Sequence, residues 1–207
     1  MGGVERRRFF TIVPAAGESL RMGRPKLLLP VQGAPLIAAT LAAWQHSQID
    51  QLVVVVRPGD DALRDACQRA GALVVVPEAA PPDMKASIQA GLAFLDATFQ
   101  PDAADAFLVA PADMPQLSPA IIDRLIENHQ AAATPTILAP ELDGKRGHPV
   151  LFPWPLAELV QRLLPQEGLN ALVDRGPLVL VGCDDLAVPG ERPFADVDTP
   201  ADYEQLE

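Results

Sequence analysis

The chain has 207 residues, a formal net charge of -11, 49% apolar residues and 21% charged residues. This length and composition suit one globular domain over residues 1–207. The acidic balance argues against a nucleic-acid partner, which needs a basic stripe, and no apolar run reaches the roughly 20 residues of a membrane helix. Cys67 and Cys183 are far apart in the sequence, which indicates that both are free thiols. Because residues 1–10 also lack a signal-peptide pattern, we expect a cytoplasmic protein.

Along the chain, short apolar runs rich in β-branched residues alternate with amphipathic stretches. The apolar runs predict buried strands at Phe9–Val13, Leu52–Val56, Leu73–Val76, Ala106–Val109, Thr136–Ala139 and Leu178–Val181. The amphipathic stretches predict helices at Pro35–His46, Asp60–Ala70, Ala86–Ala97, Pro119–Gln130, Pro155–Leu164 and Pro200–Leu206. This alternation predicts an α/β fold, a three-layer α/β/α sandwich around a mostly parallel, Rossmann-like sheet.

A segment rich in small and basic residues, Pro14–Lys26, directly follows the first predicted strand. Ligands of open α/β sheets bind beyond the carboxyl ends of the strands, and small side chains let backbone amides approach an anion. The small residues are Ala15, Ala16 and Gly17, and the cations that follow are Arg21, Arg24 and Lys26. Amides and point charges together are what a triphosphate requires. A tight turn with solvated cations is the alternative.

Two better-known phosphate-binding patterns are missing from this segment. The chain has no G-x-x-x-x-G-K-[ST] string and no G-x-G-x-x-G string. The first absence argues against a Walker A loop, and the second argues against a dinucleotide-binding oxidoreductase.

Two aspartates, Asp113 and Asp198, suit a metal site. Phosphoryl transfer uses a divalent cation, and Mg²⁺ takes one or two protein carboxylates beside substrate phosphate. Asp113 follows the strand Ala106–Val109, so we expect it at the ligand edge of the sheet, with a turn cap as the alternative. Alternation along a short strand would place Asp196 and Asp198 on the same side, with a helix N-cap as the alternative in this region.

Two further segments contain candidate binding residues. Ser87 lies in the first turn of the predicted helix Ala86–Ala97, where its hydroxyl and the free amides can face a ligand, and a cap is the alternative. In residues 144–152, two glycines flank Lys145 and Arg146, and His148 then leads into an apolar strand. A hairpin turn with a solvent-facing His148 is the alternative for this segment.

These motifs carry a family resemblance that covers about residues 9–206. Residues 15–26 read A-A-G-x-S-x-R-M-G-x-P-K and resemble the signature of MobA-like nucleotidyltransferases, which are related to molybdenum-cofactor maturation. The strings D-x-P at residue 113 and D-x-D-T-P at residue 196 extend this resemblance. The string G-x-x-G-H-P-V-L-F at residues 144–152 resembles the cytidylyltransferase branch. Asp83 is a departure, because the family commonly has Gly there.

The resemblance implies a Mg²⁺-dependent nucleotidyltransferase with the nucleotide-diphospho-sugar transferase type of fold. The implied catalytic residues are Arg21, Lys26 and Asp113. The implied metal ligands are Asp113 and Asp198, and whether Asp196 joins them is left open. The implied nucleotide-binding residues are Ala15, Ala16, Gly17, Ser19, Arg21, Lys26 and Ser87. The implied acceptor-binding residues are Lys145, Arg146 and His148.

The choice of substrates follows from the resemblance alone. Ala16, where the guanylyltransferase branch usually has Gly, predicts CTP as the nucleotide, and molybdopterin is the expected acceptor. The alternatives are a GTP-using molybdopterin guanylyltransferase, an enzyme for a sugar phosphate or another metabolite, and a non-catalytic nucleotide-binding cofactor chaperone. A monomer or weak homodimer is expected, with a molybdoenzyme chaperone as a further candidate partner.

Overall fold

The computed structural model describes residues 6–18 and 23–206. The strands are β1 (Phe9–Pro14), β2 (Pro30–Val31), β3 (Ala34–Pro35), β4 (Gln51–Val55), β5 (Leu73–Val75), β6 (Ala106–Val109), β7 (Ile137–Leu142), β8 (Lys145–Arg146), β9 (Val150–Pro153) and β10 (Leu178–Gly182). The α-helices are α1 (Leu36–Gln45), α2 (Asp61–Arg69), α3 (Met84–Phe99), α4 (Pro119–Ala131), α5 (Ala157–Gln161), α6 (Asn170–Arg175) and α7 (Pro200–Glu204). The 3-10 helices are η2 (Lys26–Leu28), η3 (Trp154–Leu156) and η4 (Asp184–Leu186).

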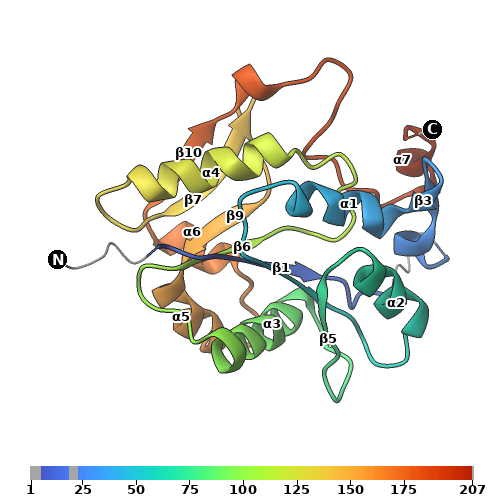
Figure 1. Cartoon of the computed structure of the whole chain (residues 1–207), viewed down its shortest axis with the longest axis horizontal. Helices are drawn as coiled ribbons and strands as arrows, with labels where there is room; N and C mark the ends of the chain where they lie inside the picture. The colour runs from blue at the N-terminus through green and yellow to red at the C-terminus, as the bar shows by residue number, and fades with distance from the viewer. Residues whose placement is uncertain (1–5, 19–22, 207) are drawn as a thin grey trace.

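A twisted central sheet has helices on both of its faces (Figure 1). In the described residues this sheet has eight strands in the order β10-β7-β9-β6-β1-β4-β5, with β8 paired to β7 outside that path. Strands β6, β1, β4 and β5 are parallel neighbours, and β10 is parallel to β7. Strand β9 is antiparallel to both of its neighbours. The predicted three-layer, mostly parallel sandwich is confirmed.

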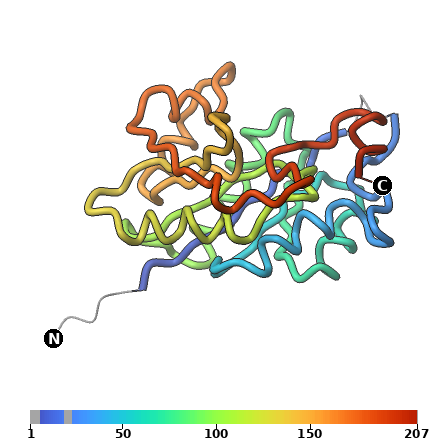
Figure 2. The backbone as a smooth tube through the Cα atoms, turned by 90° about the horizontal axis from the view of Figure 1, so that it is seen from above, coloured from blue at the N-terminus to red at the C-terminus, as the bar shows by residue number. Residues whose placement is uncertain are grey.

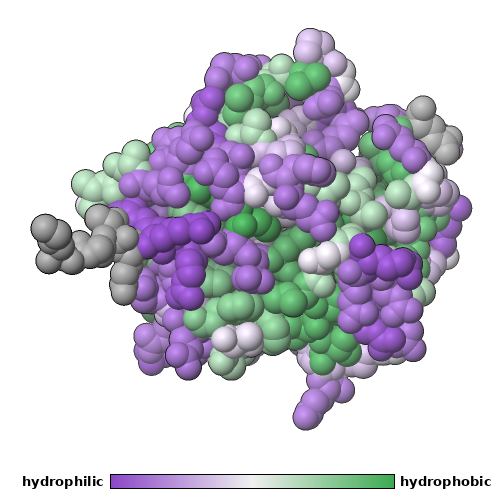
Figure 3. Space-filling model, in the orientation of Figure 1, coloured by the Kyte–Doolittle hydropathy of each residue, from purple (hydrophilic) through white to green (hydrophobic). Residues whose placement is uncertain are grey.

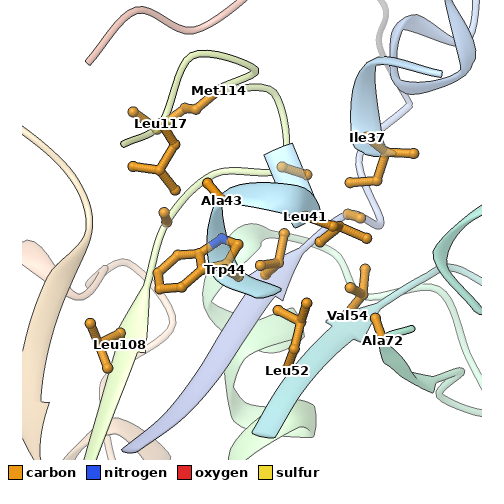
Figure 4. Packing of buried hydrophobic residues seen from close by; sticks show 14 of the residues in the cluster. Ile37, Leu41, Ala43, Trp44, Leu52, Val54, Ala72, Leu108, Met114 and Leu117 are labelled. Carbon is orange, nitrogen blue, oxygen red and sulfur yellow. The ribbon is translucent and has the colours of Figure 1, made fainter. Parts of the chain in front are cut away.

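Alternation along the strands divides the core into two hydrophobic clusters. In β1, Phe9 and Val13 pack with α1, α2 and α4, whereas Phe10 and Ile12 pack with α3, α5 and α6. Figure 4 shows Trp44 of α1 lying close to Leu52 and neighbouring apolar side chains on the first of these faces. Burial of each large apolar side chain contributes about 1.5–3 kcal/mol. The sequence places apolar residues on both faces of the central strands, which is why both faces are covered.

Some predicted elements differ from the observed ones. The helix expected at Pro155–Leu164 is η3 followed by the short α5, and Pro165 lies beyond it, where proline disfavours further helix. The six-residue α6 was missed because one and a half turns show little periodicity. The short strand expected around Asp196 and Asp198 is wrong, since the backbone there has no strand pairing. In the described chain, no helix is long and apolar enough to cross a membrane.

The carboxyl ends of β1 and β6 lie next to the C-terminal segment of the chain. Figure 2 shows that segment returning across the molecule towards the loop that follows β1. The Val197 amide donates to the Asp113 carbonyl at 3.0 Å, and the Tyr203 hydroxyl donates to the Pro30 carbonyl. These two bonds join residues that are remote in sequence, and they assemble the site described next.

Candidate active site

A cavity of about 830 Å³ opens at the carboxyl ends of β1, β4 and β6. Its described lining comes from six segments, represented by Ala15, Lys26, Arg57, Ser87, Asp113 and Asp198. Apolar surface gathers over β5 and α3 on the face seen in Figure 3. In and next to these elements, Leu73, Val76 and Met84 are exposed, and Met84 also lines the cavity. The location agrees with the rule that open α/β sheets bind ligands beyond the carboxyl ends of their strands.

Lys26, Asp113 and Asp198 form a cluster on the wall of this cavity. The Lys26 Nζ contacts Asp113 Oδ2 and lies 2.9 Å from Asp198 Oδ1. The three side chains are 14%, 12% and 23% exposed, respectively. Lys26 opens η2, Asp113 follows β6, and Asp198 precedes α7. The structure thus brings one predicted cation into contact with both predicted metal ligands.

The backbone before α7 explains how Asp196 and Asp198 reach the cavity. Thr199 and Asp202 form a capping box at the start of α7, and Asp202 also accepts a hydrogen bond from the Asp198 amide at 3.1 Å. The alternative N-cap role therefore belongs to Thr199. Val197 is buried, whereas Asp196 and Asp198 on either side of it line the cavity. The predicted orientation of these two residues is present even though the predicted strand is not.

Burial and ion pairing act against each other in this cluster. Burial lowers the pKa of the Lys26 ammonium, but the contacts with Asp113 and Asp198 outweigh it, so the pKa lies above its ordinary value. Burial raises the pKa of the Asp113 carboxyl, and the contact with Lys26 offsets part of that effect. In the described part of the chain, five buried side-chain polar atoms lack a hydrogen-bond partner. Asp113 Oδ1 is the only one of them on a residue that lines this cavity.

The loop after β1 supplies a second part of the cavity wall. Ala15 and Ala16 are buried, and the Ala15 amide donates to the Val55 carbonyl at 2.8 Å, so this amide is already engaged within the sheet. A Cβ added at Gly17 would meet no atom within 4 Å, which leaves the backbone of this residue open to close approach. The predicted residues Ser19 and Arg21 lie outside the described residues.

The start of α3 forms a third wall. Asp83 is the N-cap, because its side chain accepts a hydrogen bond from the Ala86 amide at 2.7 Å, and its φ of -152° is extended. The departure from Gly at this position is therefore compatible with the backbone, and the alternative cap role for Ser87 is wrong. Ser87 is buried, its Oγ donates to the Asp83 carbonyl at 3.3 Å, and it lines the cavity. The Lys85 ammonium donates to the carbonyls of Leu164 and Pro165 and so fixes this end of the helix.

The predicted acceptor-binding residues lie apart from this cavity. Lys145 and Arg146 form β8, an exposed hairpin strand paired with β7, and neither they nor His148 belong to the described lining. His148 is exposed, yet the surrounding protein atoms desolvate its ring and lower its pKa, against a hydrogen bond with the Val109 backbone that raises it. The charges of Asp113 and Asp196 also act on this ring. His148 is thus within electrostatic reach of the aspartates although it lines no part of the cavity.

At Gly147, residues 144–152 pack directly against the C-terminal segment. A Cβ added there would lie 2.3 Å from the ring of Phe194, so only glycine permits this close packing. Phe194 precedes Asp196 by two residues, which ties the position of residues 144–152 to that of the C-terminal aspartates.

Arg57 is a site residue that the sequence analysis did not single out. Its guanidinium lies 3.1 Å from Glu18 Oε1 and 4.0 Å from Asp60 Oδ2, and both Arg57 and Glu18 line the cavity. The available signal was its position directly after a buried predicted strand, because such positions meet the ligand edge of the sheet. Lys26 and Arg57 are the two basic side chains of the described lining.

Comparison with known proteins now identifies the family. The model of the MobA-like NTP transferase domain matches residues 11–179. The chain belongs to the MobA-like NTP transferase family. This transferase is 30% identical over 206 residues to a probable molybdenum cofactor guanylyltransferase of Mycobacterium avium, with 94% of this chain and 93% of that protein covered. It is 37% identical over 135 residues to a 2-C-methyl-D-erythritol 4-phosphate cytidylyltransferase of Xanthomonas euvesicatoria, with 63% of this chain covered.

A solved structure of Rv0371c from Mycobacterium tuberculosis H37Rv in complex with manganese is similar to this transferase along almost its whole length. The TM-score is 0.75 at 29% sequence identity, and 96% of this chain and 97% of that chain are covered. The transferase spans 49% of the length of the Xanthomonas cytidylyltransferase and about a quarter or less of two bifunctional GlmU proteins that it also matches. The chain therefore has the domain of the MobA-like NTP transferase family and the fold of this solved relative.

Proposed function

We propose that this nucleotidyltransferase transfers CMP from CTP to a phosphorylated small molecule, with molybdopterin as the first-choice acceptor, and releases pyrophosphate. The cluster of Lys26, Asp113 and Asp198 on the cavity wall carries the proposal. Phosphoryl transfer needs positive charge beside the phosphates and oxygen ligands for a divalent cation. This cluster offers both at the ligand edge of the sheet. Both hydrophobic clusters pack on the same sheet, which supports a single domain over the whole chain.

Asp113 and Asp198 are the proposed metal ligands. The buried Asp113 Oδ1 has no protein hydrogen-bond partner in the described residues, and a cation would supply one. No group of three or more His, Cys, Asp and Glu side chains in those residues has the geometry of a metal site. Two carboxylates nevertheless fit Mg²⁺, which keeps several waters and shares substrate phosphate oxygens. When bound, Mg²⁺ neutralises phosphate charge and polarises the α-phosphoryl group.

The side chains of the protein would then orient the two reactants. Lys26 and Arg21 face the triphosphate in this proposal, and the backbone around Gly17 and Ser19 holds the nucleotide. An oxygen of the acceptor phosphate forms a bond to the α-phosphorus, the bond from the α-phosphorus to its bridging oxygen breaks, and pyrophosphate leaves with that electron pair. The acceptor phosphate is already ionised, so the reaction requires no general base.

The acceptor side of the proposal involves Lys145, Arg146 and His148. These residues are exposed, and Phe194 of the C-terminal segment packs on Gly147 between them. Of the three, His148 is within electrostatic reach of Asp113 and Asp196. Positive charge there suits an anionic acceptor. We assign His148 to positioning the acceptor and not to proton transfer.

GTP is the second candidate nucleotide. The choice of CTP rests on the family resemblance at Ala16, a residue of the cavity lining where the guanylyltransferase branch usually has Gly. The similarity to the Mycobacterium avium guanylyltransferase over most of both chains favours GTP. The residue at position 16 thus favours CTP, whereas the similarity along the whole chain favours GTP.

Pyrophosphate release measured with CTP, GTP, UTP and ATP, each combined with molybdopterin and a panel of sugar phosphates, tests the proposal. We expect turnover with CTP and molybdopterin, dependence on Mg²⁺ or Mn²⁺, and loss of turnover in a chelator. Faster turnover with GTP would select the second candidate. If no combination of nucleotide, acceptor and metal gives turnover, the catalytic proposal is wrong, and a non-catalytic nucleotide-binding chaperone remains as the alternative.

A further inference from the structure

Lys26 lies where a cation bound by Asp113 and Asp198 would have to lie. Its ammonium contacts Asp113 Oδ2 and lies 2.9 Å from Asp198 Oδ1, so one positive charge bridges two carboxylates. We propose that Lys26 holds the place of the divalent cation in the ligand-free protein, so that metal alone binds weakly and binds well only together with the nucleotide. This inference rests on the proposed function, because it assumes that these aspartates are the metal ligands.

Electrostatics makes the two cations competitors. A divalent ion and an ammonium group in contact with the same carboxylate oxygens repel each other strongly, because the surroundings are largely buried and screen charge poorly. Metal entry therefore requires the Lys26 side chain to leave at least one of the two aspartates. The lost ion pair lowers the affinity for metal unless another anion receives the ammonium.

The structure shows where the displaced ammonium has room to move. Lys26 itself lines the 830 Å³ cavity, and its neighbour Leu27 is buried and holds the backbone in place. The lysine side chain can thus change rotamer while η2 stays fixed. A triphosphate in the cavity supplies the negative charge that the ammonium loses. Because binding linkage is reciprocal, the nucleotide raises the affinity for metal by the same factor as the metal raises the affinity for the nucleotide.

Removal of Lys26 should raise the affinity for metal, whereas removal of a site residue usually lowers the affinity for a ligand. Replacement of Lys26 by Met keeps an unbranched side chain and removes the ammonium that competes with a metal for Asp113 and Asp198. We expect K26M without nucleotide to bind Mn²⁺ at least tenfold more tightly than the wild type, as measured by electron paramagnetic resonance of free Mn²⁺. In the wild type, a non-hydrolysable CTP analogue should raise Mn²⁺ affinity at least tenfold, and in K26M this gain should shrink.

Three matched variants separate this inference from simpler explanations. Lys26→Arg keeps a cation beside the aspartates and should bind Mn²⁺ as weakly as the wild type. The double variant K26M/D113N should lose the gain of K26M if the metal binds at these carboxylates. Arg64→Met removes an exposed cation that pairs with Asp61 and Asp65 on α2, and it should leave Mn²⁺ affinity unchanged within about twofold.

Two outcomes overturn the inference. Mn²⁺ binding to folded K26M that is no tighter than to the wild type refutes competition, with folding checked by circular dichroism. A gain of the same size in Arg64→Met shows that general loss of positive charge is responsible. Failure of the proposed function is distinguishable, because then the wild type releases no pyrophosphate whatever K26M does to Mn²⁺ affinity. Wild-type turnover without tighter binding by K26M overturns only the inference.

Discussion

Strand β6 has an aspartate near each end, and the two are treated very differently by the protein. Asp105, just before the strand, accepts hydrogen bonds from the Arg8 amide at 2.8 Å, from the Arg8 guanidinium at 2.6 and 3.0 Å, and from the Asp102 amide at 2.9 Å. Asp113, beyond the other end, contacts Lys26 through Oδ2, and its buried Oδ1 has no partner in the described residues. Both aspartates are buried and both pair with a cation.

The difference shows that an ion pair alone does not identify a functional carboxylate. A buried polar group without a partner costs free energy, so proteins satisfy nearly all such groups. At Asp105 the chain itself satisfies both oxygens, which fits a structural role at the end of the sheet away from the cavity. At Asp113 the described residues leave one oxygen without a partner, which fits a ligand site. The same strand thus has a stabilising end and a binding end.

The largest expected effect is on activity, at the binding end. Asp113→Asn keeps the shape of the side chain and removes the charge that would hold a metal. Metal-assisted stabilisation of a phosphoryl transition state is worth several kcal/mol, so we expect kcat/KM to fall by about 10³-fold. The thermal unfolding midpoint should stay close to that of the wild type. A large loss of stability with kcat/KM retained would reverse the roles assigned to the two ends of β6.

The next effect is on stability, at the other end. Asp105→Asn leaves Arg8 without its carboxylate and removes acceptors from a fully hydrogen-bonded cluster, so the free energy of unfolding should fall by about 3 kcal/mol. Urea unfolding monitored by tryptophan fluorescence measures this loss, and kcat of the folded fraction should not change. Asp102→Asn, at an exposed turn beside it, is the control and should cost much less. Equal losses from both variants would contradict the special role of Asp105.

A pH effect is expected at the same stabilising end. His129 on α4 is 3% exposed, packs edge-on against Phe9 at 5.8 Å between ring centroids, and has an Nδ1 without a partner in the described residues. Burial, assisted by the charge of Arg7, lowers the pKa of His129. As the pH falls, His129 is therefore protonated in the unfolded chain before it is protonated in the folded chain. Stability that is present at neutral pH is lost as the pH falls below the ordinary value of about 6.5 towards the lowered pKa.

The change His129→Phe tests this assignment. Unfolding midpoints of the wild type and the variant, measured between pH 7.5 and 5, should differ in slope, with the variant losing less stability on acidification. The surface variant His46→Gln is the control. Parallel curves for wild type and His129→Phe would show that other groups cause the acid sensitivity.

The smallest effect returns to the binding end. Arg57→Ala removes a half-exposed cation from the cavity wall and leaves Glu18 without its partner. A partly exposed charge contact contributes on the order of 1 kcal/mol, so KM for the nucleotide should rise about fivefold with kcat nearly unchanged. Steady-state kinetics measures this change, and Arg64→Ala on α2 is the matched control. A rise in KM of the same size in the control would remove Arg57 from the site.

Much of the fold could be predicted because its signals are local. Buried parallel strands appear as apolar runs, and the helices between them appear as amphipathic stretches, so the layers follow from residues that are neighbours in sequence. Short elements such as α6, and the place of antiparallel β9 between β6 and β7, depend on packing against distant parts of the sheet. Such contacts leave no periodic pattern in the chain, which is why these details were missed.

The sequence by itself determined the candidate residues Lys26, Asp113 and Asp198, since each follows or precedes a recognisable element. Only the tertiary structure decided that one ammonium bridges both carboxylates, that Arg57 and Asp83 belong to the cavity, and that Lys145, Arg146 and His148 lie outside it. The physical reason is that hydrogen bonding and charge pairing in this site join residues up to 172 positions apart. Local propensities place a side chain at the edge of a sheet, but the distances between side chains from remote segments depend on the packing of the whole core.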